Sequence, residues 1–116
     1  MKRMILIVED DQDIRDMLTL FLTEQDFIII ENEDLFGKDL KQLPDLILMD
    51  NMLPTSLGKD NCAILKNNKY TEHIPIIIMS GSPVREESLK AGAAAFIAKP
   101  FDLHELLKTI NEHMPY

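Results

Sequence analysis

Short runs of apolar residues alternate with amphipathic segments along the whole chain. The runs show no apolar–polar alternation, which is typical of strands buried on both faces, as in a parallel sheet. They cover residues 4–8, 27–30, 46–49, 74–79 and 94–98. Between them, apolar residues recur at the spacing of a helix. These segments predict helices over residues 12–24, 59–67 and 82–92, a weakly patterned one over 34–42, and a last one after residue 102.

Residues with capping chemistry mark several of these helix ends. Asp11 is placed to N-cap the first helix. Ser82 as N-cap and Pro83 as first helical residue are expected to open the helix that Gly92 closes. Asp102, with a glutamate three residues later, forms a capping box for the last helix. The residues expected to face the core are Ile14, Met17, Leu18, Phe21, Leu22, Cys62, Leu65, Leu103, Leu106, Leu107 and Ile110.

Five alternations of strand and helix predict right-handed βαβ crossovers and one parallel sheet covered by helices on both faces. The expected fold class is therefore α/β, a three-layer, doubly wound (βα)5 arrangement. In the flavodoxin-like strand order 2-1-3-4-5, the first and third strands flank the crevice where such folds place their sites. With 116 residues, of which 46% are hydrophobic, the chain fits a single domain over residues 1–116.

Polar residues that carry chemistry follow four of the predicted strands. Glu9 and Asp10 follow the first strand, Asp50 the third, Ser80 the fourth and Lys99 the fifth. Because the carboxyl ends of parallel strands meet at one edge of a sheet, we expect these side chains to line one pocket. Asp50 taken alone could instead cap a turn or the next helix, since aspartate is common in turns. Lys99 is harder to explain in this way, because lysine is rarely placed at a buried strand end without a partner.

Several carboxylates in one pocket repel each other, each pair by roughly 4 kcal/mol at about 4 Å and an effective dielectric constant of about 20. Either some of them stay protonated or a cation binds. Oxygen ligands from carboxylates, a backbone carbonyl and water suit Mg2+. A pocket with this metal, a lysine and a hydroxyl is complementary to a phosphoryl group. Asp50 is the natural acceptor, because an aspartate can form an acyl phosphate while the metal and Lys99 neutralise the phosphoryl oxygens.

Charge and cysteine content narrow the classes of partner. The formal net charge of -8 disfavours direct binding to nucleic acid or to an anionic membrane surface, because phosphates would be repelled. The single cysteine, Cys62, excludes an internal disulfide and a cysteine-based zinc site, and it fits a reducing compartment. The first apolar run stops at Glu9, which makes it too short for a signal peptide or a membrane span. We therefore expect a cytoplasmic location.

The motifs at these strand ends resemble those of response-regulator receiver domains, the phospho-acceptor part of two-component systems in the CheY-like superfamily. Ile5–Asp11 resembles the family's acidic-pair motif, and Asp50–Pro54 with Gly58 resembles its phosphorylation-site motif. Ser80–Gly81 matches the pair of a serine or threonine and a small residue, and Lys99–Phe101 matches the Lys-Pro-Phe motif. The four motifs occur in the family's order and span essentially the whole chain, so the resemblance is specific.

The resemblance implies that Asp50 is the phosphorylated residue. It implies that Asp10, Asp50 and the backbone carbonyl of Met52 bind Mg2+, with Glu9 assisting through a water molecule. The implied partners are a sensor histidine kinase or a histidine phosphotransfer protein, and a downstream effector domain or protein, with a homodimer left open. The chain would not be an enzyme beyond its own phosphotransfer and autodephosphorylation.

The resemblance also implies how phosphorylation would be detected. Lys99 would pair with the phosphoryl group, and Ser80 would hydrogen-bond it. Phe96, three residues before Lys99, falls at the family's switch aromatic and, lacking a hydroxyl, would report through its burial. The Lys99–Pro100 bond is expected to be cis. The output face would consist of residues 82–92, the fifth strand and the last helix.

The chain departs from the family pattern in three places. The interval from the acidic pair to Asp50 is shorter than usual, so the second helix is expected to be curtailed. The interval from Ser80 to Lys99 is also short, which trims the helix after Ser80. Lys59 and Asn61 stand where family members often carry apolar residues, which weakens the helix over 59–67.

Three other interpretations differ in what the site would do. A haloacid-dehalogenase-like phosphatase needs a second aspartate two residues after the nucleophile, where this chain has Met52. A flavodoxin-like cofactor binder needs a loop rich in glycine, serine or threonine after the first strand, where this chain has Glu9–Asp11. A degenerate receiver that acts as a phosphorylation-independent interaction module stays open, and magnesium titration with phosphodonor labelling separates it from an active receiver.

Overall fold

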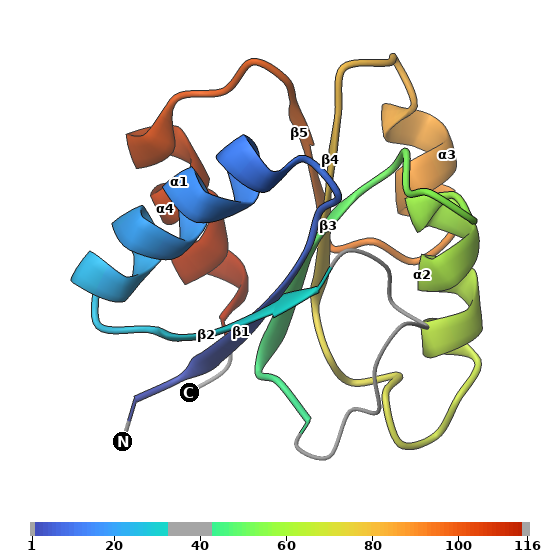
Figure 1. Cartoon of the computed structure of the whole chain (residues 1–116). Coiled ribbons are helices and arrows are strands. Elements are labelled where there is room, and N and C mark those ends of the chain that lie inside the picture. The colour runs from blue at the N-terminus through green and yellow to red at the C-terminus, as the bar shows by residue number, and fades with distance from the viewer. Residues whose placement is uncertain (1, 33–42, 115–116) are drawn as a thin grey trace.

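Five parallel strands form one central sheet in the computed structural model, which describes residues 2–32 and 43–114 (Figure 1). All the strand pairings are parallel, and the order is β2-β1-β3-β4-β5. The predicted α/β class and strand order 2-1-3-4-5 are therefore confirmed. The strands are β1 (Met4–Val8), β2 (Ile28–Asn32), β3 (Leu46–Asp50), β4 (Ile76–Ser80) and β5 (Ala95–Ala98).

Helices cover both faces of the sheet, which gives the three predicted layers. Within the described residues they are α1 (Gln12–Glu24), α2 (Gly58–Lys66), α3 (Arg85–Lys90) and α4 (Leu103–His113). In Figure 1, α1 and α4 lie on one side of the sheet, and α2 and α3 lie on the other. The helix expected over residues 34–42 lies outside the described residues. None of the helices that the structure describes has the length and apolar character needed to cross a bilayer.

Each face of the sheet has its own apolar core, and β1 contributes residues to both cores. Ile5 and Ile7 belong to the core under α1 and α4, whereas Leu6 and Val8 belong to the core under α2 and α3. Successive side chains of a strand point to opposite faces, so a strand in the middle of this sheet must be apolar at every position. This requirement explains the unbroken apolar runs in the sequence. The helices contribute Leu18, Leu22, Leu106 and Ile110 to the first core, and Cys62 and Leu65 to the second.

The expectations about burial are wrong for the second strand and for Met17. The second strand was expected to be buried over residues 27–30, yet β2 runs from Ile28 to Asn32 and Ile28 is 43% exposed. An edge strand has a neighbour on one side only, so its side chains are less covered. Met17 was expected to face the core, but it is 42% exposed, because α1 meets the sheet through Leu18 and Leu22.

The predicted N-caps of the first and last helices are confirmed, but among the described residues the return bond from the Asp102 N–H to Glu105, which a capping box needs, is not formed. The Asp11 carboxylate accepts hydrogen bonds from the backbone N–H groups of Asp13 and Ile14, at 2.9 and 3.2 Å. At the start of α4, the Asp102 carboxylate accepts hydrogen bonds from the backbone N–H groups of His104 and Glu105, at 2.7 and 3.2 Å. Gly92 ends α3 with a φ of 108°, in the left-handed region that favours glycine.

The predicted start of α3 is wrong. Ser82 was expected to be the N-cap and Pro83 the first helical residue, but α3 begins at Arg85. The Ser82 N–H instead donates to the Ser80 hydroxyl oxygen at 3.0 Å, and the Val84 N–H donates to the Ser82 carbonyl at 2.9 Å. These two bonds fold residues 82–84 into a turn, so the first helical turn cannot form there.

Cys62 provides a test of the core under α2. Its side chain is fully buried, and burial raises the pKa of the thiol, an effect that Lys66 only partly offsets. The thiolate is the reactive form, so we predict that the folded protein at neutral pH resists a thiol-labelling reagent such as DTNB. Labelling should rise in step with the unfolded fraction across a urea titration. Rapid stoichiometric labelling of the native protein would contradict this packing.

Candidate functional site

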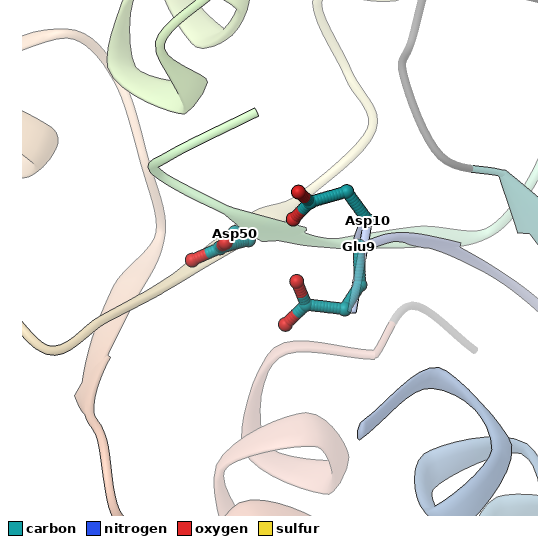
Figure 2. Close-up of side chains that lie close together, drawn as sticks. All are labelled: Glu9, Asp10 and Asp50. Atoms are coloured by element: carbon teal, nitrogen blue, oxygen red, sulfur yellow. The ribbon is translucent and has the colours of Figure 1, made fainter. Parts of the chain in front are cut away.

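Three carboxylates gather at the carboxyl ends of β1 and β3. Glu9 and Asp10 directly follow β1, and Asp50 is the last residue of β3. Each offers an oxygen, and these atoms lie within 4.8 Å of one another; Figure 2 shows the three side chains together at these strand ends. Glu9 is 1% exposed and Asp50 is 6% exposed, whereas Asp10 is exposed to solvent. The structure thus brings together the acidic residues that the strand order placed at one edge.

Lys99 joins this cluster from the end of β5. Its ammonium Nζ lies 2.7 Å from Glu9 Oε1 and 3.3 Å from Asp50 Oδ1. Its backbone N–H donates to the Ser80 carbonyl at 2.8 Å, which extends the β4–β5 pairing to the site. The Lys99–Pro100 bond is cis, as expected. One cation therefore spans two of the three carboxylates.

Burial and the ion pairs shift two pKa values in this cluster. Burial is the main cause of the raised pKa of Glu9; the hydrogen bond from Lys99 opposes it, and the charge of Asp50 adds to it. For Lys99, burial by itself would lower the pKa, but the hydrogen bond to Glu9 and the charge of Asp50 outweigh it, so the pKa is raised. Lys99 is therefore held as a cation, while Glu9 has an increased tendency to keep a proton.

Arg15 in the first turn of α1 supports the end of β1. Its guanidinium Nη1 donates to the Glu9 backbone carbonyl at 2.6 Å, and its Nε lies 3.8 Å from the Glu31 carboxylate. The Thr19 hydroxyl donates to the same carboxylate at 3.0 Å. The Glu9 N–H donates to the Asn32 carbonyl at 3.0 Å. This role of Arg15 could not be predicted from the sequence, because nothing in the pattern shows that its side chain turns back to the end of β1.

Asn51 is a second residue whose role the sequence did not reveal. Helix α2 has Leu57 at its N-cap, and no side-chain cap bond forms there. Asn51, the residue after Asp50, supplies the acceptors instead: its carbonyl accepts from the Gly58 N–H at 2.7 Å, and its Oδ1 accepts from the Lys59 N–H at 3.2 Å. The available signal was an apolar residue at the helix start, which leaves the N-terminal N–H groups needing another partner.

Gly58 allows α2 to begin directly against the phospho-acceptor candidate. A Cβ atom on Gly58 would lie 2.6 Å from the Asp50 carbonyl oxygen and 2.9 Å from Asn51 Cα. Both are backbone atoms that cannot swing aside. Glycine is therefore required by this close approach, and the start of α2 is fixed relative to Asp50.

Ser80, Met52 and Phe96 take different positions around the acidic cluster. Ser80 ends β4 and is buried, and its hydroxyl accepts the Ser82 N–H. The Met52 side chain is 59% exposed, and its backbone pairs with Leu57 in an isolated antiparallel bridge. Phe96 lies on β5 beside Ile78 and is half-buried. Phe96 is one of the residues that line a groove of about 660 Å³ along β5, with residues of α3 and α4 on its two sides.

The donor set fits a hard divalent cation. The cluster offers carboxylate oxygens from three residues within 4.8 Å of one another, and no soft ligand is among them. Such oxygen ligands suit Mg2+, which uses few protein ligands and retains water. Among the described residues, Lys99 is the one lysine that pairs with these carboxylates, so they keep an excess of negative charge that a divalent cation would neutralise.

A family model described as the response regulator receiver domain matches residues 5–111. The chain belongs to this family. The phosphate regulon transcriptional regulatory protein PhoB of Klebsiella pneumoniae is 36% identical over 121 residues, which cover 98% of this chain and 52% of that protein. The response regulator ArlR of Staphylococcus aureus (strain Mu50) is 36% identical over 110 residues, which cover 92% of this chain and 50% of that protein.

The solved structures agree with this assignment. The signal receiver domain of a signal transduction histidine kinase from Syntrophus aciditrophicus is 28% identical, with a TM-score of 0.86, over 96% of this chain and 89% of that one. The family match makes the chain a receiver domain of the two-component response regulators, and its acidic cluster fits the phosphorylation site of that family. The chain spans about half the length of the curated relatives it matches.

The raised pKa of Glu9 predicts a pH dependence of stability in metal-free buffer. A carboxyl whose folded pKa is raised stabilises the fold below its unfolded value, here about 4.5, and this contribution is lost as pH rises through the folded value. We predict that the free energy of unfolding falls more steeply from pH 4.5 upward in the wild type than in Glu9→Gln, measured by urea unfolding with a chelator. The exposed Glu24→Gln should keep the wild-type slope. Equal slopes for the wild type and Glu9→Gln would contradict the raised pKa of Glu9.

Proposed function

We propose that Asp50 accepts a phosphoryl group from a sensor histidine kinase or a histidine phosphotransfer protein. The observation that carries this proposal is the position of Asp50, which is buried at the end of the central strand with its Oδ1 3.3 Å from the ammonium of Lys99. A buried aspartate beside a fixed cation and two further carboxylates suits a nucleophile that must meet a charged phosphoryl group. A cytoplasmic location is part of this proposal.

The proposed step is a direct phosphoryl transfer. An Asp50 carboxylate oxygen forms a bond to phosphorus, and the bond from phosphorus to the donor's histidine nitrogen breaks, with its electron pair leaving on the imidazole. The product is an acyl phosphate on Asp50. Lys99 contacts Asp50 and Glu9 in this structure. A change in its side-chain conformation would let its ammonium group pair with the new phosphoryl oxygens. The chain acts on no other substrate in this proposal, apart from the slow loss of its own acyl phosphate.

We assign the cation site to Asp10, Asp50 and the backbone carbonyl of Met52, with Glu9 assisting through a water molecule. These groups would hold Mg2+, which would supply positive charge next to the phosphoryl oxygens. The convergence of the three carboxylates supports the assignment. The bridge between Met52 and Leu57 supports it as well: its hydrogen bonds run from Gly58 N to Asn51 O and from Leu53 N to Ser56 O, so neither uses the Met52 carbonyl.

Ser80 is proposed to transmit the effect of phosphorylation from Asp50 to the face formed by α3, β5 and α4. Its hydroxyl now accepts the Ser82 N–H, and it would turn to donate to a phosphoryl oxygen, which releases residues 82–84. A charge-assisted bond of this kind contributes roughly 1.5–3 kcal/mol, enough for about a ten- to hundredfold shift between two states. Phe96 would follow by changing its burial. The face of α3, β5 and α4 would then meet an effector domain or protein, or a second copy of the chain.

Phosphodonor labelling tests the assignment of Asp50. Incubation with acetyl phosphate and Mg2+ should add the mass of one phosphate to the wild-type chain, measured by intact-mass spectrometry. Asp50→Ala should gain none, and omission of Mg2+ should abolish the gain in the wild type. Labelling that persists in Asp50→Ala would show that another residue is the acceptor. A wild-type chain that binds Mg2+ but is never labelled would indicate a degenerate receiver.

A further inference from the structure

A buried amide lies beneath the connection of residues 51–57, which joins β3 to α2. Asn61, in the first turn of α2, is 1% exposed, although its neighbours in the helix, Cys62 and Leu65, belong to the apolar core. Its Nδ2 donates to the Ser56 hydroxyl oxygen at 2.9 Å. The same nitrogen lies 4.0 Å from the sulfur of Met49, the residue before Asp50. A buried amide is unfavourable unless it is hydrogen-bonded, so the bond to Ser56 is the one that offsets its burial.

Ser56 links the Asn61 amide to the backbone of the connection. Its carbonyl accepts the Leu53 N–H at 3.1 Å, and that bond is one of the two that flank the pairing of Met52 with Leu57. The other flanking bond runs from the Gly58 N–H to the Asn51 carbonyl. The backbone of Met52 therefore lies between two anchors. Asn51 fixes the start of the connection, and Asn61 fixes its end through Ser56.

We propose that Asn61 is a positioning residue for binding of a divalent cation. Through Ser56 it holds the connection of residues 51–57 so that the Met52 carbonyl is kept in place beside Asp50 before the cation arrives. This inference rests on the proposed function, because it takes the Met52 carbonyl as a cation ligand. Outer residues that orient ligands change metal affinity without touching the metal. Asn61 acts in this way from the helix, and the chain thereby gains a preformed carbonyl site.

The test compares Mg2+ dissociation constants, measured by calorimetric titration, for the wild type, Asn61→Ala, Ser56→Ala and the double variant. Loss of the bond should weaken Mg2+ binding by about tenfold in each single variant. The double variant should be no weaker than either single one, since both changes remove the same bond. At saturating Mg2+, acetyl phosphate should still label Asp50 in all of them. Ser56 is only half-buried, so Ser56→Ala gives a result even if Asn61→Ala does not fold.

Thr71→Val is the matched control for a general loss of helix stability. The Thr71 hydroxyl is buried and donates to the Leu65 carbonyl at 2.7 Å, near the other end of α2 and away from the connection. This variant loses one buried hydrogen bond but should bind Mg2+ like the wild type. If Thr71→Val weakens Mg2+ binding as much as Asn61→Ala does, the effect is not positional and the inference is wrong.

Asp10→Asn separates failure of the inference from failure of the proposed cation site. If Asp10→Asn loses Mg2+ binding while Asn61→Ala and Ser56→Ala keep the wild-type affinity, the cation site stands and the role of Asn61 is overturned. If Asp10→Asn also keeps the wild-type affinity, the proposed site itself is wrong, and the inference fails with it.

Discussion

Repulsion among three carboxylates at one edge of the sheet is the constraint on which the site depends. Glu9 and Asp50 are buried, and Asp10 places a third oxygen within 4.8 Å of theirs. Lys99 offsets part of this repulsion by contacting Glu9 and Asp50 at 2.7 and 3.3 Å. Among the described residues this one positive charge leaves the cluster negative, and the charge of Asp50 adds to the main effect of burial in raising the pKa of Glu9. The site is therefore arranged to gain positive charge, which the proposed divalent cation would supply.

The fold keeps these charges together because its parallel strands all end at the same edge. The apolar residues of β1 and β3 fix the two strands between the two cores, and the chain leaves both strands directly into the acidic residues. Arg15 on α1 and Asn51 beside α2 then fasten the strand ends from opposite faces of the sheet. The helices thus act on the site through the carbonyls of Glu9 and Asn51 and the side-chain oxygen of Asn51. The carboxylates stay available for the proposed cation and phosphoryl group.

The layers and the acidic cluster could be predicted from the sequence because they depend on local patterns, and the strand order followed from the flavodoxin-like fold class that those patterns indicate. Unbroken apolar runs, polar residues at strand ends and the caps Asp11 and Asp102 are all visible in the sequence. The start of α3 was mistaken because the Ser80 hydroxyl competes for the Ser82 N–H, a contact that no capping rule includes. Asn61 was taken as a weak position in its helix, whereas the structure shows that its amide is bonded to Ser56. The bond of Asn61 depends on how the loop before α2 folds back on the helix, which periodicity does not encode.

The most direct test of the central claim is the melting temperature of the wild type and of Asp10→Ala, each with and without saturating Mg2+. Removing one like charge should raise the melting temperature in metal-free buffer, because repulsion falls. The same change deletes a cation ligand, so Mg2+ should raise the melting temperature of the wild type but not that of the variant. An Asp10→Ala protein that melts below the wild type without metal, or a wild type that does not respond to Mg2+, would contradict the account.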